Sequence, residues 1–451
     1  MFKWLKPFNG KGKRAPSSNK SANRVYSGNA HVIPRAEHGV SRKNIDESAL
    51  KVLYRLHKSG FHACLVGGAV RDLLLGIKPK DFDIATDATP EQVKSLFRNS
   101  RLIGRRFRLA HIVFGRHVIE VATFRGDHET SKADHSHESG RILRDNVFGE
   151  IGEDVWRRDF TANALYYDIS DFSIIDYVEG LKDIRNKKLR LIGEVETRFR
   201  EDPVRMLRAI RFSAKLGFDI DDACQQAIYD FGHLLEDIPA ARLYEEALKL
   251  FHSGHALESF HQLTKYDVLK YLFPAASKGF KFNPDSEQFF KLAMQSTDER
   301  IKQGLRITPA FLFAALLWEP LQHRTKQAVK TGLPYAAALQ QSASQLISEQ
   351  VHSVSIPKRF STIMRDIWTL QSRFKYRSGR RAVSVLQHPK FRAGYDFLCL
   401  RARAGEDTEK DCQWWTDIQE KSEDQQLKML MNQKKGRSKS PHRNANRKTD
   451  Q

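Results

Sequence analysis

The spacing of hydrophobic residues divides this chain into a mixed helix-and-strand part and a longer, almost wholly helical part. Thr89 followed by Pro90 has the pattern of a helix start and predicts a helix over residues 91–97. Short apolar runs predict strands at 63–66, 110–114, 118–124, 164–169 and 173–177, and apolar residues at helical spacing precede the first of them at Ala49, Val52, Leu53 and Leu56. Residues 44–180 are therefore predicted to form an α+β head, a mixed sheet with flanking helices.

From Gly180 onward, helical periodicity dominates and no repeat of fixed period is found. The clearest helical segments are 201–218, 242–251, 257–263, 307–318, 335–347, 362–374 and 393–401. We predict an all-α neck over residues 181–236 and an all-α body over residues 237–420.

Both ends of the chain are basic and poor in hydrophobic residues. Residues 1–43 are rich in Lys, Arg, Ser, Asn and Gly, and residues 421–451 include the run KKGRSKSPHRNANRK. Such compositions bury too little apolar surface to offset the entropy of ordering. They predict a flexible basic N-terminal arm and a disordered, RNA-binding C-terminal tail.

The charge balance of the chain indicates that the protein binds polyanions. The 451 residues contain 75 Lys and Arg against 54 Asp and Glu, a formal net charge of +21. Nucleic acid is the leading candidate, ahead of acidic lipid. The N-terminus lacks the apolar core of a secretory signal, and the apolar run 310–318 is too short to span a bilayer, so we expect a soluble cytoplasmic protein.

The four cysteines are far apart and form no CxxC pair, namely Cys64, Cys224, Cys399 and Cys412. This spacing suggests neither a zinc site nor a disulfide framework. We expect reduced thiols.

The stretch LVGGAVRDLLLGIKPKDFDIAT, residues 65–86, combines a glycine pair with two spaced carboxylates. Gly67 and Gly68 open a turn before a short helix, where backbone N–H groups can face a phosphate. In a strand, Asp81 and Asp83 would project to the same side. Magnesium prefers oxygen ligands of this kind, so the stretch predicts a nucleotide and metal site.

Glu120 is a lone carboxylate in an apolar strand, and it is either a third acidic group of that site or an ordinary solvated glutamate. The polar segment 126–140 contains His128, His135 and His137. Such a segment is more typical of a flexible loop than of a metal centre, so these histidines are not assigned to the site.

Two further stretches mix charged residues with apolar ones. In VWRRDFTANALYYD, residues 155–168, the polar side chains could hold a ribose and a triphosphate, or Asp159 could simply cap a helix. In EDPVRMLRAIRFSAKLGF, residues 201–218, Asp202 fits an N-cap and Arg205 follows one turn later. An aspartate beside an arginine offers an acceptor and fork-shaped donors to a base edge, although an ordinary surface ion pair has the same spacing.

In the predicted body, basic residues alternate with aromatic ones over residues 373–381 and 390–403. This composition suits backbone contacts and base stacking on a single strand, and a solvated basic face is the alternative.

Taken together, GGAVRD with DFD, RRDFTANAL and EDPVRMLR resemble the motifs of the template-independent class II nucleotidyltransferases. This family contains the tRNA CCA-adding enzymes and the bacterial poly(A) polymerases. The resemblance runs from about residue 31 to residue 417, and the two tails match in composition only. The segment LIGRRFRLAHIVFG, residues 102–115, is similar to one that sets the poly(A) polymerases apart, and no His-Asp dipeptide of the hydrolase domain found in some CCA-adding enzymes is present.

The resemblance implies transfer of AMP from ATP to RNA 3' ends, with release of pyrophosphate. Asp81 and Asp83 would bind two Mg²⁺ ions, one activating the RNA 3'-hydroxyl and one holding the ATP phosphates, with Glu120 as a further candidate ligand. Asp159 and its neighbours would hold the ribose. The implied nucleotide-binding set is Gly67, Gly68, Arg71, Asp72, Arg158, Asn163, Asp202, Arg205 and Arg208.

Two alternatives stay open on the sequence. A tRNA CCA-adding enzyme shares every catalytic motif, and a non-catalytic basic RNA-binding protein would use only the body, although the intact DFD counts against it. Expected partners are RNA 3' ends and ATP, together with RNA-decay or RNA-chaperone proteins, and the chain is expected to be a monomer.

Overall fold

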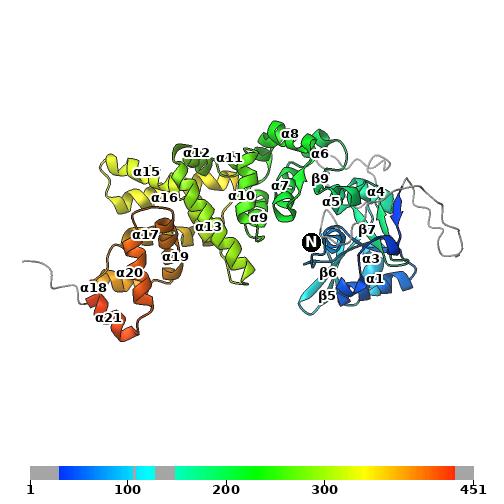
Figure 1. Ribbon diagram of the computed structural model, residues 1–451, viewed down its shortest axis with the longest axis horizontal. Coiled ribbons are helices and arrows are strands. Elements are labelled where there is room, and N and C mark those ends of the chain that lie inside the picture. Colours follow the sequence, from blue (N-terminus) through cyan, green and yellow to red (C-terminus); the bar gives the residue numbers. More distant parts are fainter. Residues whose placement is uncertain (1–29, 105–107, 127–147, 432–451) are drawn as a thin grey trace, which may run out of the picture. The chain divides into compact units, whose positions relative to one another are not determined.

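A computed structural model describes residues 30–104, 108–126 and 148–431. The chain divides after Leu234 into two compact units, of which the first contains the sheet and the second is helical (Figure 1). The finer division into head, neck and body stays a prediction.

Eight strands of the first unit form one mixed sheet in the order β1-β8-β7-β2-β3-β6-β5-β4. The pair β3 and β6 is parallel, and all other neighbours are antiparallel. The strands are β1 (His31–Ile33), β2 (Ala63–Val66), β3 (Asp83–Thr86), β4 (Ser100–Ile103), β5 (Leu109–Phe114), β6 (His117–Thr123), β7 (Leu165–Asp168) and β8 (Ile174–Asp176). The predicted mixed sheet is confirmed.

Two helices of this unit begin at capping side chains. Asp46 accepts hydrogen bonds from the N–H groups of Ser48 and Ala49 at the start of the first helix, and Thr89 forms a capping box with Gln92 at the start of the third. The α-helices are α1 (Glu47–Lys58), α2 (Gly68–Leu74), α3 (Pro90–Leu96), α4 (Ile151–Trp156), α5 (Gly180–Arg185), α6 (Val195–Glu201), α7 (Val204–Leu216) and α8 (Asp222–Phe231). Shorter elements are η1 (Arg35–Glu37), η2 (Arg42–Asn44), η3 (Thr161–Asn163), η4 (Gly232–Asp237) and the parallel pair β9 (Lys188–Leu189) and β10 (Asp219–Ile220).

The predicted N-terminal arm over residues 1–43 is wrong in its last part. Strand β1 pairs antiparallel with β8 at the edge of the sheet, and the side chains of Ile33 and Val40 are buried. Three residues of strand are too few to produce a detectable hydrophobic period, so composition masked this edge strand. Residues 1–29 lie outside the described residues, as do residues 105–107 of the LIGRRFRLAHIVFG segment and the histidines His128, His135 and His137.

The described part of the second unit consists of helices, with an aromatic core that includes Phe251, Phe260 and Phe290. The helices are α9 (Ala240–Phe251), α10 (Ala256–Lys265), α11 (Leu269–Leu272), α12 (Pro274–Phe282), α13 (Pro284–Lys302), α14 (Pro309–Leu316), α15 (Trp318–Lys330), α16 (Tyr335–Ser353), α17 (Lys358–Arg373), α18 (Gly379–Leu386), α19 (Phe391–Arg403), α20 (Glu409–Gln419) and α21 (Glu423–Met431).

The apolar run at 310–318 falls in α14 and the first residue of α15, where nearly every side chain is buried. It is a core helix of the unit. Among the described residues, no helix has the length and apolar character needed to cross a membrane.

The predicted C-terminal tail begins too early. Residues 423–431 form α21, and Leu430 is buried against a core that contains Trp415 and Ile418. A single buried leucine in a polar helix gives too weak a periodic signal to be recognised. Residues 432–451, which contain the most basic run, lie outside the described residues.

The expectation of reduced thiols is also wrong for one pair. Cys399 on α19 and Cys412 on α20 form a disulfide, with their Cα atoms 5.1 Å apart. The pairing follows from the close packing of these two consecutive helices, which cysteine spacing alone does not reveal. Cys64 and Cys224 are not part of this disulfide, and both are buried.

Candidate active site

The three predicted metal ligands line one cleft beside the interior strands β3 and β6. Asp83 opens β3, and the parallel register places it beside Glu120 of β6. Asp81 lies two residues earlier, and all three residues line a cleft of about 1110 Å³. Lys43, Lys78, Lys80 and Arg116 line the same cleft, so it offers both carboxylates and cations.

The expected strand alternation of the two aspartates is only partly correct. Strand β3 starts at Asp83, so Asp81 belongs to the preceding loop. Glu120 accepts a hydrogen bond from His111 at 3.1 Å, and the three carboxylates do not all converge within 4.8 Å of one another. The structure brings the three acidic residues to one cleft without forming a closed ligand cage.

The carboxyl group of Asp83 has a raised pKa in this cleft. Its pKa is raised to about 6, chiefly because the carboxyl group is desolvated and also because Glu120 and Asp81 place negative charge beside it. Arg158 opposes this effect. A carboxylate crowded by like charges is the arrangement that a divalent cation relieves.

The described part of the chain also contains a buried cluster formed by His62, Cys64 and Asp168. His62 Nε2 lies 2.8 Å from an Asp168 carboxylate oxygen, and the Cys64 sulfur lies 3.5 Å from the same nitrogen. The three residues do not line the carboxylate cleft. The contact between His62 and Asp168 links the residue before β2 to the last residue of β7.

The glycine pair forms the predicted turn between β2 and α2. Gly67 has φ of +75°, which an L side chain rarely adopts, and its N–H donates to the carbonyl of Leu165 at 3.3 Å. A Cβ added at Gly67 would lie 3.7 Å from Arg158 Nη1, so the glycine turn and the RRDFTANAL segment are neighbours.

The buried Arg71 side chain connects the glycine turn to the RRDFTANAL segment. Its guanidinium is 2% exposed, donates to Asp72 at 2.6 and 2.8 Å, and also donates to Asn163. Asp72 in turn lies 3.4 Å from Lys215 Nζ on α7. Because Arg71 is fully engaged with protein groups, it holds α2, η3 and α7 together, and its predicted contact with a nucleotide stays a prediction.

Asp159 and Arg208 form a second bridge to α7. Asp159 accepts hydrogen bonds from the Phe160 N–H at 2.7 Å and from Asn163 at 3.2 Å, while its other oxygen pairs with Arg208. Burial alone would raise the pKa of Asp159, but Arg208 and these hydrogen bonds more than offset it, so the pKa lies below its ordinary value. Asp159 is therefore a fixed anion rather than a proton carrier.

Arg158 is held by two residues that the sequence interpretation missed. Its Nε donates to the Tyr166 hydroxyl at 2.7 Å, and its Nη2 donates to Asp154 at 2.8 Å. The Tyr166 hydroxyl donates to Asp154 at 2.6 Å. The i, i+4 spacing of Asp154 and Arg158 was a visible signal, but Tyr166 lies in an apolar strand and gave none.

Asp202 and Arg205 are positioned at the start of α7. Asp202 accepts from the Val204 N–H at 3.3 Å, but Pro203 occupies the N-cap position of α7, so the predicted N-cap at Asp202 is wrong by one residue. Arg205 donates to the Arg198 carbonyl at 2.6 Å and to Glu201 at 2.8 Å. The structure therefore fixes the Arg205 side chain through residues of α6, and the proposed contact with a base edge stays a prediction.

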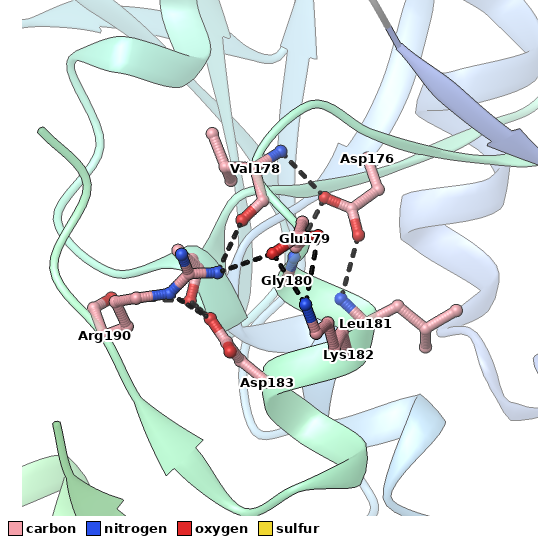
Figure 2. A network of polar contacts seen from close by, with 9 residues as sticks. Asp176, Val178, Glu179, Gly180, Leu181, Lys182, Asp183 and Arg190 are labelled. Carbon is pink, nitrogen blue, oxygen red and sulfur yellow. Dashed lines mark hydrogen bonds and ion pairs between the residues drawn. The ribbon is translucent and has the colours of Figure 1, made fainter.

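Residues between 176 and 190 form a network of polar contacts next to the RRDFTANAL segment (Figure 2). Asp176, at the end of β8, accepts from the N–H groups of Val178, Gly180 and Leu181 and so caps α5. Asp183 accepts from Arg190 Nε at 2.9 Å, and Arg190 also reaches the Val178 carbonyl.

This network contacts the RRDFTANAL segment directly at Thr161. The Thr161 hydroxyl donates to Asp183 at 2.6 Å, and its N–H donates to the Arg190 carbonyl at 3.0 Å. A Cβ added at Gly180 would lie only 2.2 Å from the Thr161 carbonyl oxygen. Gly180 therefore allows α5 and the segment to approach closely.

Three family models match the chain. They are the poly A polymerase head domain over residues 63–190, the probable RNA and SrmB-binding site of polymerase A over residues 217–280, and the polymerase A arginine-rich C-terminus over residues 331–449. Poly(A) polymerase I of Salmonella typhimurium is 50% identical over 408 residues, which cover 88% of each chain. The chain belongs to the poly(A) polymerase I family.

Other members of the poly(A) polymerase I family match over similar lengths. The Escherichia coli O6:H1 protein is 51% identical over 88% of each chain, and the Haemophilus influenzae protein is 43% identical over 94% of this chain and 95% of its own. By contrast, the CCA-adding enzyme of Lactobacillus helveticus is 38% identical over 47% of this chain and 51% of its own.

Solved structures show the same fold. A Bacillus stearothermophilus CCA-adding enzyme in complex with CTP covers 82% of this chain with a TM-score of 0.57 and 25% identity, and 82% of that enzyme is covered. The nucleotidyltransferase fold with a helical C-terminal region is thereby confirmed.

Proposed function

We propose that this chain is a template-independent polynucleotide adenylyltransferase that adds AMP from ATP to RNA 3' ends. The RNA 3'-oxygen attacks the α-phosphorus of ATP, a new P–O bond forms, the bond to the β-phosphate oxygen breaks, and pyrophosphate leaves with the 3'-hydroxyl proton released. The observation that carries the proposal is the cleft of Asp81, Asp83 and Glu120 in a chain 50% identical to a poly(A) polymerase I over 88% of its length.

The donor set of the cleft fits magnesium. Its three acidic side chains supply hard oxygen ligands, and the pKa of Asp83 is raised first by its burial and then by the negative charges of Glu120 and Asp81. Asp81 and Asp83 would hold two Mg²⁺ ions, with Glu120 as a further ligand. Bound there, the ions would neutralise triphosphate charge and lower the pKa of the RNA 3'-hydroxyl.

The protein's own residues supply orientation. The Gly67–Gly68 turn and Arg158 lie beside one another and are proposed to face the triphosphate, while Asp159 and Asn163 hold the ribose. Asp202 and Arg205 are proposed to favour adenine. Because Arg71, Asp72 and Lys215 tie these segments together, we assign them a positioning role in the same pocket.

A product analysis tests the proposed reaction. Purified protein with an unstructured RNA, Mg²⁺ and one nucleotide at a time should extend the RNA by many residues with ATP and poorly with CTP. Addition of two C residues followed by arrest after a single A would instead identify a CCA-adding activity. The non-catalytic alternative predicts no extension with any nucleotide.

Proton competition at Asp83 gives a pH-dependent prediction. Because the pKa of Asp83 is about 6, its carboxylate is protonated below that pH and cannot bind a cation. Mn²⁺ affinity of the nucleotide-free protein should fall about tenfold between pH 7 and pH 5, measured by isothermal titration calorimetry. Affinity that does not change over this range would contradict the placement of a metal at Asp83.

The same shift predicts a change in stability without metal. The folded-state pKa of Asp83 is raised from 3.8, so protonation favours the folded state, and this contribution is complete below about pH 4 and lost as the pH rises through about 6. Asp83→Asn should therefore flatten the decline in melting temperature of the metal-free protein between these values. The control is Asp219→Asn, an exposed carboxylate in β10 of the same unit.

Substitution of Gly180 should disturb the RRDFTANAL segment. In Gly180→Ala, the methyl group would clash with the Thr161 carbonyl, so we expect a loss of about 1–3 kcal/mol in stability and a rise in the KM for ATP. Gly39→Ala is the matched control, because a Cβ there meets nothing within 4 Å. An unchanged KM for ATP in Gly180→Ala would show that ATP binding does not depend on the close approach of α5 to Thr161.

The remaining partner predictions rest on resemblance. The protein is expected to be a monomer in the cytoplasm and to meet RNA-decay or RNA-chaperone proteins. Analytical ultracentrifugation of the purified chain tests the monomeric state.

A further inference from the structure

The helical unit contains a cavity of about 510 Å³, which is separate from the carboxylate cleft. Its walls come from the end of α9, the second half of α13, the segment before α14, and α19. The volume lies in the range of small-molecule sites. No step of the proposed reaction uses this cavity.

The lining is cationic at the surface and apolar inside. It contains five arginine and lysine residues and one carboxylate, Asp396: the cations are Arg300, Arg306, Lys390, Arg392 and Arg403. The apolar lining includes Ile307, Phe311, Leu312, Ala393 and Leu400. Asp396 is paired with Arg392 at 2.9 Å, so the remaining cations give the rim a positive balance.

One ring nitrogen of an imidazole in this cavity has no hydrogen-bond partner in the described part of the chain. His252 lines the cavity, and its Nε2 is buried without a hydrogen bond among the described residues. Burial lowers the pKa of His252 to about 4, so the ring is neutral at neutral pH and can donate or accept a hydrogen bond. Buried polar atoms are nearly always paired in native proteins, so a ligand with a polar edge would explain this one.

We propose that this cavity binds one nucleotide of the RNA chain, with its base inside against the apolar lining and its phosphates on the cationic rim. A base offers both a flat apolar face and a hydrogen-bonding edge, which match the apolar lining and the His252 nitrogen. The proposal rests on RNA being the substrate of the proposed function, and it adds a contact with the RNA in the helical unit.

The spacing of the cations on the rim favours an RNA strand over a free nucleotide as the ligand. Lys390 at the N-cap and Arg403 at the end of α19 are about 20 Å apart at the rise of about 1.5 Å per residue. Cations this far apart are too widely spaced for the phosphates of one free nucleotide, and they suit separate phosphates along a strand. Free ATP also offers a base and phosphates, and the experiment distinguishes binding of ATP from binding of an RNA strand.

The test uses two variants of the full chain. Ala393→Phe fills the cavity without changing its charge, and Lys390→Gln removes one rim cation without filling it. Ala336→Phe and Lys326→Gln, at exposed positions of α16 and α15, are the matched controls. Binding of a fluorescein-labelled 20-nucleotide oligo(A) is followed by anisotropy at several salt concentrations without ATP or metal, and the KM for ATP is measured separately.

We expect Ala393→Phe to weaken oligo(A) binding by about fivefold or more, with the KM for ATP unchanged. Lys390→Gln should reduce the slope of log affinity against log salt by about 0.7. If both variants bind oligo(A) like their controls, or if only the KM for ATP changes, the proposal is overturned. Because binding is measured without catalysis, this outcome is independent of whether AMP transfer is observed.

Discussion

The double variant Asp81→Asn with Asp83→Asn should lose AMP transfer by at least about a thousandfold while keeping its RNA affinity. The two amides keep the size of the side chains but can no longer provide anionic ligands. RNA affinity should be retained, because removal of two negative charges does not weaken contacts to phosphate. The measurements are primer extension with ATP and anisotropy with a 3'-deoxy oligonucleotide.

Two comparisons make this result specific. Asp219→Asn changes an exposed carboxylate of the same unit and should leave extension unaffected. Glu120→Gln should reduce extension if Glu120 is a ligand, and it should also lower the pKa of Asp83, since Glu120 is one cause of its elevation. Extension by the double variant at the wild-type rate would falsify the assignment of the cleft.

Arg208→Gln should destabilise the first unit by about 3–5 kcal/mol and raise the KM for ATP. The substitution leaves the Asp159 carboxylate, whose side chain is only 12% exposed, without its cation. The double variant Asp159→Asn with Arg208→Gln should recover part of the stability, because no buried charge remains. Hydrogen exchange of peptides from α7 reports the local loss, and steady-state kinetics report the change in ATP binding.

Arg205→Gln is the control on the same helix. Its partner Glu201 has a side chain 45% exposed, so loss of that ion pair should change stability by less than about 1 kcal/mol. If Arg205→Gln and Arg208→Gln destabilise the protein equally, the ion pair of Arg208 with Asp159 contributes no more to stability than the exposed pair of Arg205 with Glu201.

Local signals predicted most of the elements that carry the site. Thr89 with Pro90 predicted α3, the glycine pair predicted the turn before α2, and Asp202 with Pro203 predicted the start of α7 to within one residue. Each depends on neighbours within four residues, where backbone chemistry is decisive. The resemblance of the three motifs then predicted the family, which the relatives confirm.

Contacts between distant segments could not be predicted in this way. The placement of Glu120 beside Asp83 depends on the parallel pairing of β3 with β6, and hydrophobic alternation does not specify which strands pair. The engagement of Arg71 with Asn163, 92 residues later, has no local signature either. Strand β1 was missed because three residues show no hydrophobic period, and the Cys399–Cys412 disulfide because cysteine spacing does not reveal how two helices pack.

The buried link from Arg71 through Asp72 to Lys215 has a consequence for biosynthesis. Asp72 and Lys215 are 143 residues apart, so the ribosome must complete α7 before this link can close. Translation at about 5–20 residues per second leaves the glycine turn without its final support for several seconds. We expect nascent chains that end before residue 204 to contain the strands of the sheet yet bind ATP poorly. The proposed nucleotide pocket would thus be completed late in synthesis, long after its first residues are made.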